Sequence, residues 1–231
     1  MHTPSGERLA RRLINLLLRL TTRIEVFGIE NLPTHGSFVA ASNHIGRLDV
    51  LLVYRYTDRA DIIVLVAEKY ARYPLARWFV RQLNAIFIDR FNADFTVLRE
   101  ILRRLKGGGA LVLAPEGTRS PTAALQEAWS GAGYIALKAG APVLPVGMAG
   151  SEDRLFFANL KRLRRTPVTV RIGKPFLLDK AAGQDREAAL QTATDEIMCR
   201  IAALLPPEYR GVYADHPRLQ ELLQADEGKD A

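Results

Sequence analysis

Two loops of the sequence combine residue types that can carry out group-transfer chemistry. The first holds His44 and, five residues later, Asp49, with Gly46 between them to allow a bend. An aspartate at that spacing can accept a hydrogen bond from one imidazole nitrogen, which leaves the other nitrogen to take up a proton near neutral pH. The pair therefore predicts a general base, although a simpler interpretation is that Asp49 only caps the helix that follows.

The second loop follows an apolar run that ends at Ala114, and it reads Pro115-Glu116-Gly117-Thr118-Arg119-Ser120. Glycine lets the backbone approach a ligand closely, and a guanidinium binds phosphate in a bidentate fork. We expect this loop to bind a phosphate group, unless it is an ordinary surface turn with a solvated arginine. A third candidate is Arg90, which could reach the same crevice or could form an exposed ion pair with Asp89 that adds little stability.

Other features of the sequence point away from disulfides, metals and nucleic acids. Cys199 is the one cysteine, which excludes an intramolecular disulfide and every C-x-x-C site. One motif histidine with one aspartate offers too few ligands for zinc, so no metal is expected. The basic group within 161–165 could contact acidic lipid headgroups or coenzyme phosphates. Because no recognition helix and no interleaved aromatics accompany it, nucleic acid is not an expected partner.

The residues around these loops alternate between strand-like and helix-like runs, which predicts an α/β fold. Strands separated by helices favour parallel pairing in a buried sheet, so we expect a mostly parallel, mixed sheet flanked by helices. The connection from 149 to 167 is long enough to permit an antiparallel strand, and strand order is not predicted. The expected strands are Phe38–Ala41, Ile62–Val66, Ala85–Ile88, Ala110–Ala114, Val143–Val146 and Val168–Ile172, and the expected helices are Asp49–Tyr56, Leu75–Leu83, Phe95–Lys106, Gly133–Ala139 and Arg186–Leu205.

An amphipathic helix is expected at the start of the chain, from Glu7 to Ile24. Its leucines recur at spacings of three and four, while its arginines gather along a different stripe. Such a helix either lies in a membrane interface or packs its apolar side on its own protein.

Length and composition predict one domain with short appendages. Of the 231 residues, 48% are hydrophobic and 25% charged, and 32 Lys and Arg against 25 Asp and Glu give a net charge of +7, which suits anionic partners. No run approaches the roughly 20 apolar residues of a spanning helix, and without a signal-peptide pattern the mature chain is expected to begin near Met1. We divide the sequence into an amphipathic membrane-associating helix at 1–24, a main domain at 25–223 and a disordered acidic tail at 224–231.

Taken in order, these loops resemble the motifs of the glycerolipid acyltransferase family, the PlsC-like or 1-acylglycerol-3-phosphate acyltransferases. The family's N-H-x-x-x-x-D block corresponds to residues 43–49, and its phosphate-binding block to residues 115–120. Two further blocks are similar to residues 85–90 and 141–146. The similarity covers about residues 25–178 and closes with Ile-Gly-Lys-Pro at 172–175.

The resemblance implies an enzyme that moves a fatty acyl group from acyl-CoA or acyl carrier protein to the free hydroxyl of 1-acylglycerol-3-phosphate. The product is phosphatidic acid, and no further cofactor is needed. It implies that His44 takes the hydroxyl proton while Asp49 holds the imidazole. It also implies a peripheral or monotopic protein on an anionic membrane surface, at the cytoplasmic face. The residues implied in substrate binding are Arg90, Glu116, Gly117, Thr118 and Arg119.

Departures from the family pattern leave other functions open. Gly46 stands where the family often has a serine, so a hydroxyl that could assist the site is missing, and Ala114 stands where an aromatic is usual. Alternative acceptors are glycerol-3-phosphate, another lysophospholipid or a lyso-ornithine lipid. A non-catalytic lipid-binding protein is a second alternative. A hydrolase is a third, although the sequence lacks a G-x-S-x-G nucleophile elbow.

Overall fold

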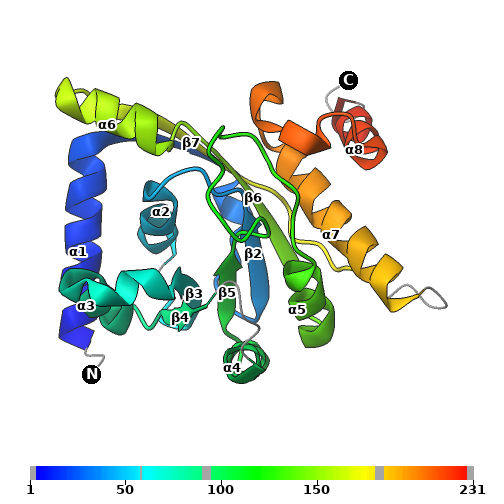
Figure 1. The fold of residues 1–231 in the computed structure, drawn as a ribbon, viewed down its shortest axis with the longest axis horizontal. Helices are drawn as coiled ribbons and strands as arrows, with labels where there is room; N and C mark the ends of the chain where they lie inside the picture. The colour runs from blue at the N-terminus through cyan, green and yellow to red at the C-terminus, as the bar shows by residue number, and fades with distance from the viewer. Residues whose placement is uncertain (1–3, 58, 90–94, 180–184, 228–231) are drawn as a thin grey trace.

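The computed structural model describes residues 4–57, 59–89, 95–179 and 185–227, and in these ranges one mixed sheet lies between two layers of helices (Figure 1). The strands are β1 (Thr22–Phe27), β2 (Phe38–Ser42), β3 (Ile62–Ala67), β4 (Ile86–Ile88), β5 (Ala110–Leu113), β6 (Val143–Ala149) and β7 (Thr166–Ile172). The α-helices are α1 (Pro4–Thr21), α2 (Leu48–Tyr56), α3 (Pro74–Gln82), α4 (Phe95–Lys106), α5 (Gly131–Ala139), α6 (Asp153–Lys161), α7 (Arg186–Ala203) and α8 (Pro217–Glu227). Short 3-10 helices are Ile29–Asn31, Glu68–Arg72, Pro207–Tyr209 and Gly211–Tyr213.

Strand directions decide which loops meet. The order is β1-β7-β6-β2-β5-β3-β4, and the described pairs are parallel except for β6 with β7. The expected mostly parallel, mixed sheet is therefore confirmed. Because β2, β5 and β6 run in one direction, the loops that follow them open at a single edge of the sheet. Since β7 and β1 run the opposite way, the turn before β7 and the end of α1 lie at that same edge.

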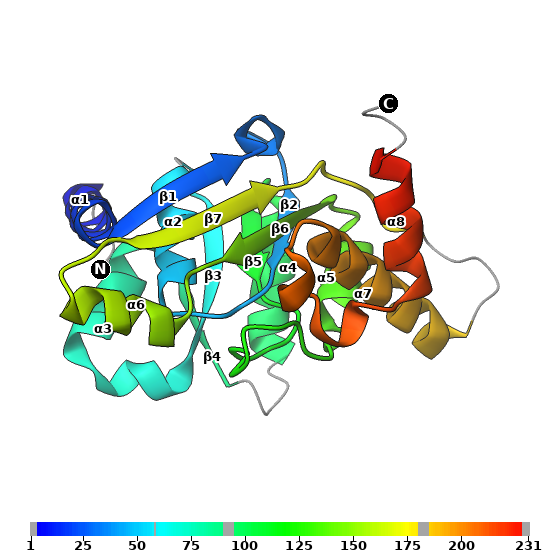
Figure 2. The ribbon, with the colours of Figure 1, turned by 90° about the horizontal axis from the view of Figure 1, so that it is seen from above.

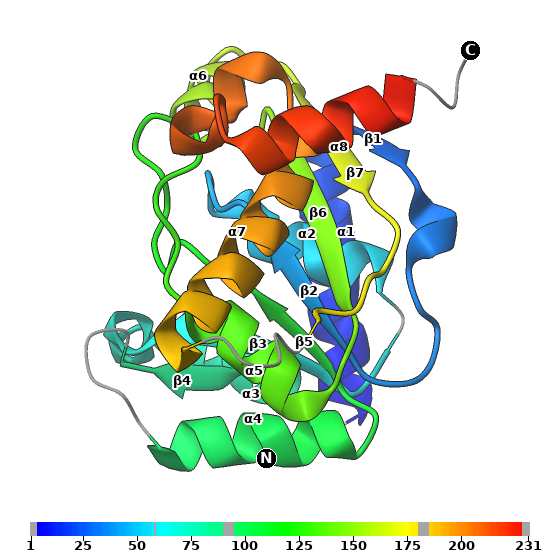
Figure 3. The ribbon, with the colours of Figure 1, turned by 90° about the vertical axis from the view of Figure 1, so that its right-hand side faces the viewer.

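The helices cover both faces of the sheet. Strand β2 is buried on each face, since Phe38 and Ala40 belong to one core cluster while Val39 and Ala41 belong to the other. Successive strand residues point to opposite faces, so a strand covered on both sides becomes a continuous apolar run. Helices α1, α2 and α3 pack over the Phe38 side, and α4, α5 and α7 over the other, where α8 lies against α7 (Figures 1 and 3).

Three elements differ from the expected ones. Helix α1 ends at Thr21 rather than Ile24, because residues 22–27 pair with β7 as the edge strand β1. The connection between β6 and β7 holds helix α6, so the basic group begins at the end of a helix. Helix α8 was not expected, and its last turn, residues 224–227, takes up half of the predicted tail.

Helix α1 packs on the sheet through a different side from the one that carries most of its leucines. Ala10, Ile14 and Leu18 are its buried residues, and they join the core under α2 and β2. The five leucines of its other apolar side remain 43–63% exposed; they are Leu9, Leu13, Leu16, Leu17 and Leu20, and we call them the α1 leucine stripe. Within the described ranges no helix has both the length and the apolar character needed to cross a bilayer.

Arg11 fixes α1 to the domain. Its guanidinium donates hydrogen bonds to three backbone carbonyls at the end of α2, those of Tyr54 at 3.0 Å, Thr57 at 2.8 Å and Arg59 at 3.0 Å. Its Nε donates to the Glu7 carboxylate at 2.9 Å. These carbonyls lie beyond the helical bonds of α2, so Arg11 satisfies acceptors that would otherwise lack a donor.

Arg11→Ala should therefore lower the free energy of unfolding by about 3 kcal/mol, because it leaves several partly buried acceptors without a donor. Urea denaturation measures this change. Arg12→Ala is the matched control, since Arg12 is exposed on the same helix. An equal loss of stability in both variants would contradict the anchoring role of Arg11.

Candidate active site

His44 and Asp49 form a hydrogen-bonded pair at the edge where β2 ends. The imidazole Nδ1 lies 2.8 Å from Asp49 Oδ2, and the histidine side chain is 24% exposed while the aspartate is buried. With Nδ1–H donating to the carboxylate, Nε2 keeps its lone pair. The predicted pair is therefore in place for a base whose ring is held by a buried acid.

The carboxylate of Asp49 also orders the loop that carries His44. Its Oδ2 accepts backbone N–H groups from Ile45 at 2.8 Å and Gly46 at 3.0 Å. The simpler interpretation of Asp49 as a helix cap does not describe these contacts, because the carboxylate turns back toward the preceding loop. The other oxygen, Oδ1, accepts a hydrogen bond from Ser151 Oγ at 2.5 Å. A buried carboxylate requires such partners, and here they come from two different loops.

Ser151 could not be found from the motifs, and it reaches Asp49 because position 46 is glycine. A Cβ on Gly46 would lie 1.8 Å from the backbone oxygen of Ser151. A serine at 46, which the family often has, does not fit in this arrangement. Instead, the hydroxyl of Ser151 in the loop after β6 contacts Asp49. The sequence signal was the run Gly150-Ser151-Glu152-Asp153, in which a small residue is followed by two acids at the start of a helix.

Two further buried side chains hold the His44 loop through hydrogen bonds to backbone groups. The buried amide of Asn43 donates to Met148 O and accepts from Met148 N, each at 2.8 Å, which continues the pairing of β2 with β6. Glu116 is 2% exposed, and its two oxygens accept backbone N–H groups from His44 and Gln126, each at 3.1 Å. Burial raises the pKa of this carboxyl group above its usual value. Glu116 therefore positions the loop, and its expected part in substrate binding stays a prediction.

The loop after β5 lies against the His44 loop. Ser120 N–H donates to the His44 carbonyl at 2.8 Å. Gly117 turns the chain with φ +67°, and a Cβ there would approach the Trp129 ring to 3.1 Å, so the position requires glycine. Thr118 is exposed in the same loop. The structure thus brings the two predicted loops together.

Arg119, predicted to bind phosphate, pairs with an acid that the motifs did not include. Its guanidinium donates to the carboxylate of Asp153, in the first turn of α6. Asp153 also accepts the backbone N–H of Arg47 at 2.9 Å and lies 3.6 Å from the Arg47 guanidinium. A guanidinium has five N–H donors, so Arg119 keeps donors for a second anion. Arg90, the remaining predicted residue, lies outside the described residues.

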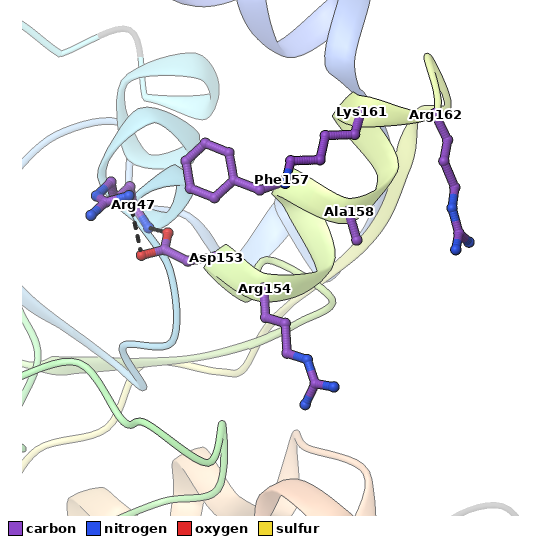
Figure 4. A pocket seen from close by; sticks show the side chains of 7 residues that line it. All are labelled: Arg47, Asp153, Arg154, Phe157, Ala158, Lys161 and Arg162. Carbon is purple, nitrogen blue, oxygen red and sulfur yellow. Dashed lines mark hydrogen bonds and ion pairs between the residues drawn. The ribbon is translucent and has the colours of Figure 1, made fainter.

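An open, positively charged pocket adjoins this pair (Figure 4). Its volume is about 590 Å³, and the Arg47 guanidinium lies 5.7 Å from the centre of the Phe157 ring at its side. The one carboxylate in its lining, Asp153, is already engaged by Arg47 and Arg119. The lining residues are Arg47, Asp153, Arg154, Phe157, Ala158, Lys161 and Arg162. This excess of cations suits a ligand with phosphate groups.

The described residues thus combine a histidine that could act as a base, an acid that orients it, and a pocket lined by cations from the His44 loop and α6. This arrangement can remove a proton from a hydroxyl while its neighbours hold an anionic substrate. In the described ranges no group of three or more His, Cys, Asp and Glu side chains is placed to hold a metal ion.

Comparison with known proteins gives this geometry a family context. The family model described as Acyltransferase matches residues 23–149. A chloroplastic 1-acyl-sn-glycerol-3-phosphate acyltransferase of Brassica napus is 26% identical over 192 residues, which is 76% of this chain and 54% of that protein. A 1-acyl-sn-glycerol-3-phosphate acyltransferase of Bacillus subtilis is 24% identical over 83% of this chain and 92% of its own. The chain therefore spans about half the length of the first relative and most of the second.

A solved structure shares the fold. The crystal structure of the 1-acyl-sn-glycerophosphate (LPA) acyltransferase PlsC from Thermotoga maritima superposes with a TM-score of 0.60 and 27% sequence identity. The match covers 84% of this chain and 75% of that one.

Ser151→Ala should lower the free energy of unfolding by about 1–3 kcal/mol, because Asp49 Oδ1 loses its hydroxyl donor in a buried site. Thermal denaturation measures the change. Ser130→Ala serves as control, since Ser130 is exposed and its hydroxyl makes no cap hydrogen bond at the start of α5. If both variants melt at the wild-type temperature, the hydroxyl does not support Asp49.

Proposed function

We propose an acyl-transfer function for this chain, which belongs to the acyltransferase family. The reaction moves a fatty acyl group from acyl-CoA or acyl carrier protein to the free hydroxyl of 1-acylglycerol-3-phosphate and yields phosphatidic acid. The observation that carries the proposal is the 2.8 Å contact between His44 Nδ1 and the buried Asp49, within the matched region and at the edge where three strand-end loops meet. The names of the relatives support the choice of acceptor.

The chemistry follows from the orientation of the ring. His44 Nε2 takes the proton of the acceptor hydroxyl as the oxygen attacks the thioester carbonyl. Asp49 stabilises the imidazolium that forms. When the tetrahedral intermediate collapses, the C–S bond breaks and the imidazolium returns the proton to the leaving thiolate. The ester is thus formed directly between the two substrates, without an acyl-enzyme.

Phosphate groups of the two substrates match the cations beside the base. Arg119 sits on the loop whose Ser120 contacts the His44 carbonyl, so a phosphate bound there lies close to the reacting hydroxyl. The pocket between the His44 loop and α6 offers four more cations for the phosphates of the donor or for the acceptor headgroup. Holding both substrates by their anionic groups provides the orientation that lowers the barrier.

The α1 leucine stripe suits an enzyme whose acceptor and product reside in a bilayer. An exposed apolar stripe beside arginines is typical of helices that lie in the membrane interface. We propose that α1 holds the protein on an anionic membrane surface, as a peripheral or monotopic protein at the cytoplasmic face.

His44→Ala should fold normally and lower turnover by about 10² to 10⁴-fold, the usual contribution of a general base. Asp49→Asn should act similarly, because an amide cannot stabilise the imidazolium as a carboxylate does. The assay is thiol release from palmitoyl-CoA in detergent, with lysophosphatidic acid, glycerol-3-phosphate or no acceptor. Palmitoyl-acyl carrier protein is the second donor.

Thiol release that requires lysophosphatidic acid and His44 supports the proposal. Full activity of His44→Ala would refute the base. Acceptor-independent release would identify a hydrolase, and silence with both donors would favour a lipid-binding protein.

Arg119→Ala should raise the KM for the acceptor about tenfold or more while kcat changes less, because it removes a charge-assisted contact to phosphate. Steady-state kinetics at saturating donor separate the two constants. Arg103→Ala is the control, since Arg103 is 71% exposed and pairs with Glu100 on α4. A lower kcat at unchanged KM would count against phosphate binding by Arg119.

A further inference from the structure

The turn between α6 and β7 contains a leucine in a backbone conformation that leucine rarely adopts. Leu163 has φ +52°, and it follows the last residues of α6. Its N–H donates to Leu160 O at 3.0 Å, and Arg164 N–H donates to Asn159 O at 2.9 Å. This pair of bonds is the Schellman motif, in which the residue at the position of Leu163 is usually glycine. The left-handed conformation is strained for a side chain with a Cβ.

The side chain of Leu163 has no packing role that would offset this strain. It is 94% exposed, which is the largest exposure among the described large hydrophobic residues. Other described non-glycine residues with positive φ are Asn84, an ordinary residue for this conformation, and the small Ala123. An apolar residue that is both strained and solvent-exposed indicates a function outside the folded monomer.

Cations surround this leucine on both sides. The turn reads Lys161-Arg162-Leu163-Arg164-Arg165, all five residues are exposed, and in the part of the chain described none of the four cations has an ion-pair partner. We call residues 161–165 the cationic turn. An apolar side chain flanked by lysine and arginine matches the boundary of a bilayer, where the apolar group enters the acyl region and the cations meet anionic headgroups.

The cationic turn lies next to the end of the α1 leucine stripe. Thr166 pairs with Thr22 at the start of the parallel strands β7 and β1. Leu163 lies three residues before Thr166, and Leu20 lies two residues before Thr22. In Figure 2 the connection from the end of α6 into β7 passes close to the end of α1, where β1 begins. Both segments lie at the sheet edge that holds His44, so a surface that contacts both would also face the candidate site.

We propose that the cationic turn is a second membrane-attachment site, in which Leu163 inserts into the surface of a bilayer that contains anionic phospholipid. The inference rests on the proposed function in that it extends the attachment by α1. Two attachment points orient a protein on a surface, whereas a single helix leaves it free to rotate about that helix. With both points engaged, the edge that holds His44 faces the membrane from which the acceptor comes.

Leu163→Gly separates membrane binding from folding. Glycine is favoured at this backbone position, so the variant should melt at or above the wild-type temperature. Its partition coefficient onto vesicles of phosphatidylcholine and phosphatidylglycerol should fall about tenfold, as expected for loss of one buried leucine. Leu163→Asn should act in the same direction, since asparagine also tolerates the left-handed conformation. Arg164→Gln and Arg165→Gln should each lower binding about fivefold, and only to vesicles with phosphatidylglycerol.

Leu177→Gly is the matched control, because Leu177 is 66% exposed and follows Phe176, which bridges to Val143 at the opposite edge of the sheet. Wild-type binding by both Leu163 variants, or an equal loss in Leu177→Gly, would overturn the proposal. Thiol release in detergent, where no bilayer is present, should be unchanged in Leu163→Gly, and vesicle binding is measured whether or not the acyl-transfer proposal holds. Slower turnover with acyl carrier protein as donor and unchanged vesicle binding would assign the turn to the carrier instead.

Discussion

The buried carboxylate of Asp49 is the interaction on which the candidate site depends. One oxygen accepts hydrogen bonds from the imidazole of His44 and from two backbone N–H groups of its loop. The other accepts a hydrogen bond from the hydroxyl of Ser151. A charge taken out of water is tolerated only where hydrogen bonds replace its hydration. The requirement to satisfy this one group therefore fixes the His44 ring, the loop before α2 and the loop after β6 relative to each other. Glu116 likewise fixes the His44 loop relative to the loop after β5, because its carboxylate accepts hydrogen bonds from the backbone N–H groups of His44 and Gln126.

Strand direction extends this local order to the whole molecule. The reversal between β6 and β7 returns the chain to the edge where β2, β5 and β6 end. As a result, Asp153 at the start of α6 contacts Arg119, while the other end of α6 leads into the turn beside α1. A fully parallel sheet would have needed a crossover at this point and would have placed that turn at the far edge. His44, the pocket cations, the cationic turn and the end of the α1 leucine stripe share one edge because of one antiparallel pair.

The parts of this arrangement that follow local patterns were predictable from the sequence. Runs such as Ile62–Val66 and Phe95–Lys106 have the composition and period of single elements, and the two motif loops stand directly after strands. Strand β1 was missed because Ile24 continues the helical spacing of Leu20, and only pairing with β7 shows where the helix ends. Helix α6 was missed because it buries Phe156 alone and so lacks a clear apolar face. Ser151 and Asp153 act on residues more than thirty positions away, and no local pattern encodes such contacts.

The close approach at Gly46 restricts the order in which this site can change. A serine at 46 would place its Cβ 1.8 Å from the Ser151 backbone oxygen, so the loop after β6 would have to withdraw first. That withdrawal would move Asp153 as well, and with it the partner of Arg119. Positions 46, 151 and 153 thus form an epistatic group, in which a residue tolerated in one background is excluded in another. A sequence with serine at 46 is therefore expected to differ from this one in the loop after β6 as well. Transferring only the His44 loop, or only the loop after β6, from such a sequence into this chain would create a steric clash or lose the contact to Asp49.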